Sequence, residues 1–311
     1  MNFNPPSRSE ALLAIGNTAN VPGIPKKALD PGRDFDQIPA PRPGDWLAEH
    51  PEKGQTFDDF SRIIPARPAE AQDKIYFQPL GEFAEDRSPS LAVLREYAET
   101  YFQMEVILLP PKDIFGGPIR TRINPFVDKL QVLTGDVLRM LKKRFPNDAY
   151  CLLGMTMEDL YPDPFWNFVF GQVSLRHRIG IFSFARYDPV FYGEKRGRGY
   201  ERLLLRRSCK VLAHETAHMF FLKHCIFFRC AMNGSNHLEE SDARPLNLCP
   251  VCLRKLQHVI GFDVRERYRG LLKFYRKFAL SSEKKWVEKR LKRIGYDRNK
   301  NQSSSVMPCI L

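Results

Sequence analysis

The residues most able to do chemistry gather between positions 214 and 252. Three histidines, four cysteines and one glutamate lie there, and all three residue types are used in zinc sites. This set is His214, Glu215, His218, His224, Cys225, Cys230, Cys249 and Cys252; His237, Glu239 and Glu240 lie in the same stretch and are not part of the set. We interpret the rest of the chain as the scaffold that positions them.

The first half of this stretch contains the motif His-Glu-Thr-Ala-His. Because His214 and His218 are four residues apart, a helix places both rings on one face, where they can hold one zinc ion. In this motif Glu215 takes a proton from water that the metal acidifies. The helix must then end near Phe220 and turn back to deliver His224. Three histidines leave a coordination position open, which is typical of a catalytic zinc.

The alternative to a zinc site is that the motif arises by chance and that its histidines are buried core residues with hydrogen-bond partners. The third histidine and the adjacent cysteines favour the metal site. His237, Glu239 and Glu240 are further potential ligands nearby. The two predicted zinc sites already have enough protein ligands, so we interpret these residues as ones that shape a loop.

Two pairs of cysteines form the second half of the stretch. Four residues separate Cys225 from Cys230, and Cys249 and Cys252 belong to a Cys-Pro-Val-Cys knuckle. Four thiolates leave no open position, so the pattern predicts a closed, structural zinc site. A pair of disulfides is the alternative, which a chain of intracellular character disfavours. Because Cys225 directly follows His224, the structural zinc is expected to fix the approach of that histidine.

The order of these residues, with Met232 and the segments 234–240 and 244–252, resembles the archaemetzincin family of zinc metallopeptidases. The resemblance covers about residues 75–275. It implies a metzincin-like zincin fold, a catalytic zinc on the three histidines, Glu215 as general base and a second zinc on the four cysteines. It also implies that Met232 lies under the active site, although a soft apolar filler is an equally compatible role.

One position departs from the family pattern. Phe221 stands where the family usually has glycine, which supplies the positive φ that ends the helix and turns the chain. For phenylalanine that conformation costs about 1–2 kcal/mol in steric strain. Either Phe221 is strained, or the helix ends by another route. We expect zinc on three histidines in both cases.

The scaffold is predicted to be a mixed α/β (α+β) domain over residues 71–280, because apolar strands alternate with amphipathic helices. Strands are predicted at 75–80, 104–109, 150–156, 167–171 and 179–187, and helices at 90–102, 125–145 and about 200–220. The strand at 179–187 is expected to edge the cleft and pair with peptide backbone. An ordinary interior strand is as compatible with its composition.

The two ends of the chain differ from this domain. Residues 1–70 hold many of the 24 prolines, so we expect a poorly ordered arm with a short helix near 57–63. Residues 281–311 are expected to form a basic helical tail with a disordered end, and helices are predicted at 264–279 and 282–294. Between Arg265 and Lys300 there are 14 basic and 4 acidic residues. We interpret this charge as the solvent-exposed face of basic helices. The alternative is a surface that binds nucleic acid.

Two functions compete on these grounds. The first is a monomeric zinc metallopeptidase with two zinc ions that hydrolyses peptides; the resemblance makes an aminopeptidase-like preference for short peptides plausible. The second is a catalytically weak, zinc-stabilised scaffold that binds nucleic acid or a protein through its basic tail. An intact Glu215 favours the first and Phe221 mildly favours the second. The absence of a signal-peptide pattern and of long apolar runs predicts an intracellular protein, cytoplasmic or nuclear, without a membrane partner.

Overall fold

The computed structural model describes residues 3–19, 21–22, 24–63, 67–69 and 71–295. Its strands are β1 (Lys74–Leu80), β2 (Val106–Leu108), β3 (Thr121–Asn124), β4 (Lys129–Leu133), β5 (Ala149–Thr156), β6 (Asp159–Tyr161), β7 (Gly171–Ser174) and β8 (Ile179–Ser183). Its α-helices are α1 (Arg8–Leu13), α2 (Lys26–Leu29), α3 (Trp46–Glu49), α4 (Phe57–Arg62), α5 (Leu91–Phe102), α6 (Thr134–Lys142), α7 (Tyr200–Met219), α8 (Leu238–Ala243), α9 (Pro250–Ile260), α10 (Val264–Lys277) and α11 (Ser281–Arg293). The mixed α/β class is therefore as predicted.

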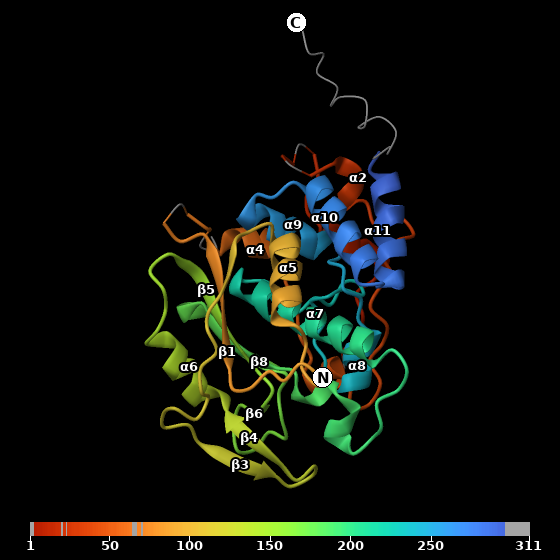
Figure 1. Cartoon of the computed structure of the whole chain (residues 1–311). Helices are drawn as coiled ribbons and strands as arrows, with labels where there is room; N and C mark the ends of the chain where they lie inside the picture. Colours follow the sequence, from red (N-terminus) through yellow and green to blue (C-terminus); the bar gives the residue numbers. More distant parts are fainter. Residues whose placement is uncertain (1–2, 20, 23, 64–66, 70, 296–311) are drawn as a thin grey trace, which may run out of the picture.

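The central sheet has five strands in the order β2–β1–β5–β8–β7. The first four are parallel, and β7 pairs antiparallel with β8 at the edge. Alternate residues of β1 face opposite cores: Phe77 packs with α5 and α7, whereas Tyr76 packs on the side of α6. Strand β5 is buried along its whole length, as is typical of a strand covered on both faces. A smaller sheet, β3–β4–β6, lies at one end (Figure 1).

The structure corrects one prediction about these strands and decides between two alternatives for another. Residues 125–145 were expected to form one helix, but the chain forms a β3–β4 hairpin before α6 begins at Thr134. The side chain of Asn124 accepts hydrogen bonds from the amides of Phe126 and Val127, and Asp128 adopts a φ of 50°, which together build the hairpin turn. Of the two alternatives for 179–187, the interior strand is the one adopted: it forms β8, which ends at Ser183, while β7 takes the edge of the sheet.

Helix α7 crosses the middle of the molecule between the sheet and the C-terminal helices (Figure 1). It is 20 residues long and matches the predicted helix at about 200–220. The ammonium group of Lys210, only 2% exposed, donates to the carbonyl oxygens of Ser241 (2.9 Å) and Asp242 (2.7 Å), and so ties α7 to α8. Burial lowers the pKa of Lys210 to about 7.

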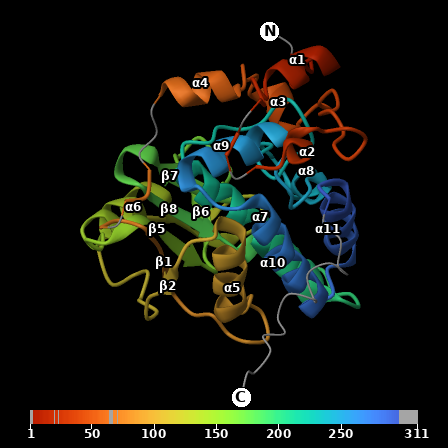
Figure 2. The ribbon, with the colours of Figure 1, turned by 90° about the horizontal axis from the view of Figure 1, so that it is seen from above.

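The N-terminal segment differs from the expected poorly ordered arm. Ser7 and Thr56 form capping boxes at the starts of α1 and α4, which satisfy the first amide groups of these short helices. Figure 2 shows α1–α4 gathered beside α9. Leu29, Phe35 and Phe60 are at most 3% exposed and belong to the main core, so apolar contacts order this proline-rich stretch. The helix expected at 57–63 is α4; residues 64–66 and 70 lie outside the described part.

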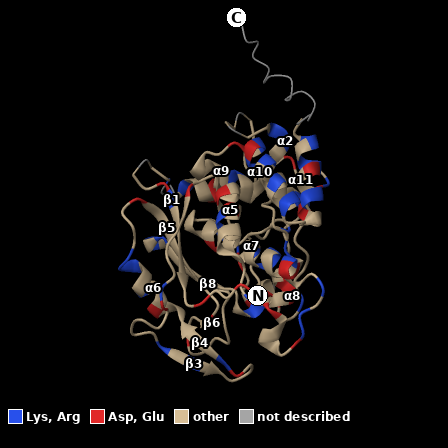
Figure 3. Cartoon of the chain, viewed as in Figure 1, with Lys and Arg blue, Asp and Glu red and all other residues tan. Residues whose placement is uncertain are grey.

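The C-terminal helices α10 and α11 lie close to the predicted bounds, and their basic residues are visible in Figure 3. Much of this charge is paired within the chain. Arg290 is fully buried and donates to Asp34 at 2.7 Å, and Arg293 pairs with Asp30 at 2.6 Å. The expected disordered end (296–311) lies outside the described residues, and the domain boundaries at 70 and 280 remain predictions. None of the described helices combines the length and apolar composition needed to cross a membrane.

If the N-terminal segment is part of the core, replacing Phe60 by Ala should lower the free energy of unfolding by about 3–5 kcal/mol, because a fully buried ring leaves a cavity. Denaturant unfolding would measure this. Leu13→Ala is the control, since Leu13 is 77% exposed and its truncation should change stability little. Equal, small effects of both substitutions would show that the segment does not pack as described.

Lys210 predicts a pH dependence of stability. Its pKa is lowered in the folded state to about 7, from the 10.5 of an unfolded lysine. Between these values the unfolded chain binds the extra proton, so this group makes stability rise as pH rises from about 7 toward 10. Lys210→Met removes the titrating group. From about pH 7 to about pH 10, the unfolding free energy of wild type should therefore rise relative to that of Lys210→Met. A pH-independent difference would contradict the lowered pKa.

Candidate metal centre and catalytic cleft

The structure brings the three predicted histidines together. His214 and His218 lie one turn apart on α7, and the chain folds back after this helix to bring His224 to the same place. The Nε2 atoms of His214 and His218 are 3.1 Å apart, and one nitrogen of each of the three rings lies within 4.8 Å of the others. Zinc–nitrogen bonds of about 2.0–2.1 Å in a tetrahedron imply nitrogen separations of about 3.3 Å, so this set fits a zinc ion.

Each imidazole is oriented through its Nδ1 atom. The carbonyl oxygen of Ala231 lies 2.9 Å from Nδ1 of His214, and that of Leu222 lies 2.6 Å from Nδ1 of His218. Nδ1 of His224 instead meets a carboxylate oxygen of Glu52 at 2.7 Å. Because all three partners are acceptors, they favour a proton on Nδ1 and leave the Nε2 lone pairs for a metal.

The electrostatics of the cluster keep its helical imidazoles neutral. Burial and the neighbouring rings lower the pKa of His214 well below its usual value and that of His218 to about 3. Burial raises the pKa of Glu215 to about 8, and the charge of Arg244 opposes this rise. Neutral imidazoles are the form that binds a metal, and a carboxyl group titrating near neutrality can exchange protons with substrate.

Glu215 faces the edge strand of the central sheet. A Cβ atom added to Gly171 of β7 would lie 2.6 Å from the carboxyl carbon of Glu215, so a larger residue there would displace the carboxylate or the strand. Gly171, Gln172 and Val173 line a cavity of about 560 Å³ together with the three histidines and Glu215. The edge of β7 therefore runs beside the histidine cluster.

Phe221 resolves the two alternatives left open by its sequence position. Its φ is 64°, in the left-handed region, directly after the end of α7, so the strained conformation is the one adopted. The side chain of Gln55 holds this turn on both sides: its Nε2 donates to the carbonyl oxygen of Phe221 at 3.4 Å, and its Oε1 accepts from the amide of Lys223 at 3.2 Å. Lys255 in turn donates to the backbone oxygen of Gln55.

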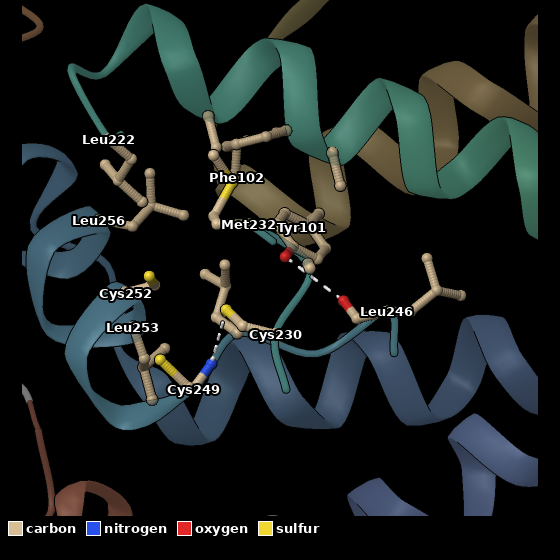
Figure 4. Packing of buried hydrophobic residues seen from close by; sticks show 14 of the residues in the cluster. Tyr101, Phe102, Leu222, Cys230, Met232, Leu246, Cys249, Cys252, Leu253 and Leu256 are labelled. Carbon is tan, nitrogen blue, oxygen red and sulfur yellow. Dashed lines mark hydrogen bonds between the residues drawn. The ribbon is translucent and has the colours of Figure 1, made fainter. Parts of the chain in front are cut away.

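The four predicted cysteines also converge. All four Sγ atoms lie within 4.8 Å of one another, and those of Cys225 and Cys249 are 3.6 Å apart. Figure 4 shows Cys230, Cys249 and Cys252 near the start of α9. The amide of Cys249 donates to the sulfur of Cys230 at 3.2 Å. Zinc–sulfur bonds of about 2.3 Å imply sulfur separations of about 3.8 Å, whereas a disulfide needs about 2.05 Å. The set fits a tetrahedral zinc ion.

The two clusters are joined by one short stretch of backbone. The amide of Cys225 donates to the carbonyl oxygen of Met232 at 2.8 Å, and the preceding carbonyl, of Ala231, orients His214. Met232 is fully buried. A third group of potential ligands, Asp45, His237 and Glu240, already makes hydrogen bonds within the protein, as expected of loop-shaping residues.

Sequence analysis missed several residues around this site. Trp46, Glu52 and Gln55 lie far from the motif in the chain, and only the folding of the N-terminal segment brings them near. Gly171 and Arg244 also line or contact the site without any spacing that marks them. No local sequence pattern signals these residues, because their contacts join parts of the chain that are distant in the sequence.

The strain at Phe221 predicts a specific pair of effects. Phe221→Ala and Phe221→Gly both remove the ring, but only glycine adopts a φ of 64° without steric cost. The glycine variant should therefore be more stable than the alanine variant by about 1–2 kcal/mol, or bind metal at the histidine cluster more tightly. Thermal unfolding and metal competition would measure these effects. Alanine equal to or better than glycine would show that the turn is wrongly described.

The chain is similar to members of one peptidase family. Residues 120–258 match the model of peptidase family M54. Archaemetzincin-2 of Macaca fascicularis is 42% identical over 277 residues, which cover 80% of this chain and 77% of that protein. Human archaemetzincin-1 is 36% identical over 256 residues, covering 73% and 51%. The crystal structure of an archaemetzincin from Archaeoglobus fulgidus, complexed with malonate, is 28% identical and covers 58% of this chain and 99% of that chain, with a TM-score of 0.45. The identity to archaemetzincin-2 over four-fifths of the chain shows that this protein belongs to the archaemetzincin family of zinc metallopeptidases.

Proposed function

We propose that this protein hydrolyses peptide bonds at a zinc ion held by His214, His218 and His224, with Glu215 as general base. The observation that carries the proposal is the convergence of one ring nitrogen from each of three histidines in a cleft that Glu215 also lines. The Nδ1 atom of each ring lies beside an acceptor oxygen. A zinc ion there supplies Lewis-acid chemistry, which acidifies water and polarises a peptide carbonyl.

The residues of the chain divide the remaining work. Glu215 takes the proton of the attacking water and passes it to the leaving amine, a role that its place beside the three histidines in the same cleft allows. Strand β7 offers its outer backbone edge to the substrate, which adds to the sheet as an extended strand. Because Gly171 has no side chain, the strand can lie directly against Glu215.

We propose a second, structural zinc on Cys225, Cys230, Cys249 and Cys252. Four thiolates close its coordination shell, so its role is to hold the bend that carries His224. Met232 supports the same bend through its carbonyl oxygen. We further propose that the protein works in a reducing intracellular compartment, which keeps thiols free; the six described cysteines are free thiols. The monomeric state remains a prediction from the sequence.

The finer proposal is an aminopeptidase-like action on short peptides. The ring of His50 lies against two tryptophan rings: its centroid is 5.3 Å from that of Trp166, on which it stacks, and 4.4 Å from that of Trp46. The two tryptophans both line the cavity, one from the N-terminal segment and one from the loop before β7. A wall at this place limits how far a peptide can extend past the histidine cluster on one side.

The scaffold alternative is not favoured. Membership of a peptidase family and the carboxylate beside the histidines support catalysis. Several basic groups of the C-terminal helices contact acids of the same chain, such as Arg290 with Asp34 and Arg276 with Glu288, and this reduces the free positive charge available to a nucleic acid.

Glu215→Gln tests the proposal. The variant should retain two zinc ions per chain and lose peptide cleavage by about 10²–10⁴-fold, because it keeps the shape of the side chain but cannot accept the proton. Metal analysis and cleavage of a set of short peptides, with free and with blocked N-termini, would measure both. An aminopeptidase-like enzyme should spare the blocked peptides.

Glu201→Gln is the matched control, since Glu201 lies exposed in the first turn of the same helix, and it should leave turnover unchanged. Equal cleavage by wild type and Glu215→Gln would end the assignment of the general base. Wild-type protein without metal at the histidines would end the proposed function as a whole.

A further inference from the structure

The third histidine of the cluster differs from the other two in what orients it. Backbone carbonyl oxygens meet Nδ1 of His214 and His218, whereas a carboxylate, that of Glu52, meets Nδ1 of His224 at 2.7 Å. Glu52 is 172 residues away from His224 in the sequence. It also lies outside the residues 120–258 that match the peptidase family model.

We propose that Glu52 is a positioning residue for the zinc site, so that the N-terminal segment completes the metal centre of this enzyme. The inference rests on the proposed function, because it takes His224 to be a zinc ligand. A carboxylate that accepts from Nδ1 fixes the tautomer and the ring plane of a ligating histidine and raises the basicity of its Nε2 atom. It also places a carboxylate next to a site whose proposed protein ligands are all imidazoles.

Glu52 is itself held in place. The indole nitrogen of Trp46 donates to the same carboxylate oxygen at 2.6 Å, and the indole ring meets the ring of His224 edge-on with 5.1 Å between centroids. The side chains of Glu52 and His224 are 26% and 19% exposed, so water screens their contact less than at an open surface. Trp46 therefore braces both members of the pair.

The segment that carries these two residues is anchored to the bend from several directions. A Cβ atom on Gly234 would lie 2.3 Å from the Trp46 ring, so glycine makes the room that the indole occupies. The amide of Trp46 donates to the carboxylate of Glu240 at 3.0 Å. Beyond Glu52, Gln55 bonds to both sides of the turn at Phe221. Contacts of Trp46 and of Gln55 therefore anchor the segment on both sides of Glu52, and they hold the Glu52–His224 contact in place.

Removing Glu52 should weaken metal binding at the histidine cluster alone. Glu52→Ala should lower the zinc affinity of that site by about 10–100-fold, and Glu52→Gln, which keeps an acceptor oxygen but not the charge, should lower it less. Trp46→Phe keeps an aromatic ring and removes the N–H donor, so it should give a small loss in the same direction. The affinity of the four-cysteine site should not change in any of these variants.

Chelator competition with Co²⁺-loaded protein would measure both sites at once, because thiolate-bound and imidazole-bound Co²⁺ absorb differently. Glu49→Gln is the control, since Glu49 ends α3 and its carboxylate accepts only from the exposed loop amide of Gly44 among the contacts described. Glu52 does not line the cavity. The zinc-saturated Glu52→Gln enzyme should therefore change kcat rather than KM.

The outcomes separate this inference from the proposed function. If His224→Ala loses one metal equivalent while Glu52→Ala and Glu52→Gln bind zinc as tightly as wild type, the positioning role is wrong and the proposed zinc site stands. If His224→Ala keeps both metals, the proposed site itself is wrong. If Glu52→Ala fails to fold, Glu52→Gln decides: an unchanged affinity and an unchanged kcat would overturn the inference.

Discussion

The place of His224 is the constraint on which the rest of the site depends. Two imidazoles on one helical face converge by local geometry, but the third has to be returned to them by a bend of the chain. That bend begins at Phe221, whose φ is 64°. This left-handed conformation is sterically unfavourable for a residue with a side chain. It exists because the surrounding structure holds it, as is typical of strain near a functional site.

Three separate parts of the molecule hold the bend. Gln55 bonds to its start, Glu52 bonds to His224, and Cys225, the next residue, belongs to the thiol cluster. These three supports come from two parts of the chain: Gln55 and Glu52 belong to the N-terminal segment, and the cysteine partners of Cys225 at the start of α9 follow the bend. If His224 is a zinc ligand as proposed, it needs such support, because a small displacement of one imidazole would disturb a tetrahedral site.

The proline-rich N-terminal segment is therefore part of the working enzyme. Its apolar residues, such as Phe35 and Phe60, enter the main core, and Asp34 balances the buried charge of Arg290. The same ion pair explains why a cluster of basic residues in the sequence does not make an equally basic surface. A charge buried without a partner is costly, so the helix α11 and the N-terminal segment stabilise each other only when both are in place.

The sequence by itself determined what depends on near neighbours. The four-residue spacing in a helical pattern placed His214 and His218 on one face, and the bounds of α7 followed from the same periodicity. The convergence of the four cysteines was also predictable, because metal-ligand spacing is a local pattern. Propensity failed at 125–133, where an apolar stretch that suits a helix forms a hairpin because Asn124 and Asp128 turn the chain.

Only the tertiary structure decided which strand edges the cleft and what supports the third histidine. Strands β7 and β8 are both short and carry no charged side chains. Their order in the sheet depends on which strands they pair with, and the alternation of apolar residues along the sequence does not reveal this. Trp46, Glu52 and Gln55 carry no motif, since their roles arise from contacts across more than 160 residues of chain. Burial and long-range hydrogen bonds gave these residues their function, and neither can be read from the spacing of residues along the sequence.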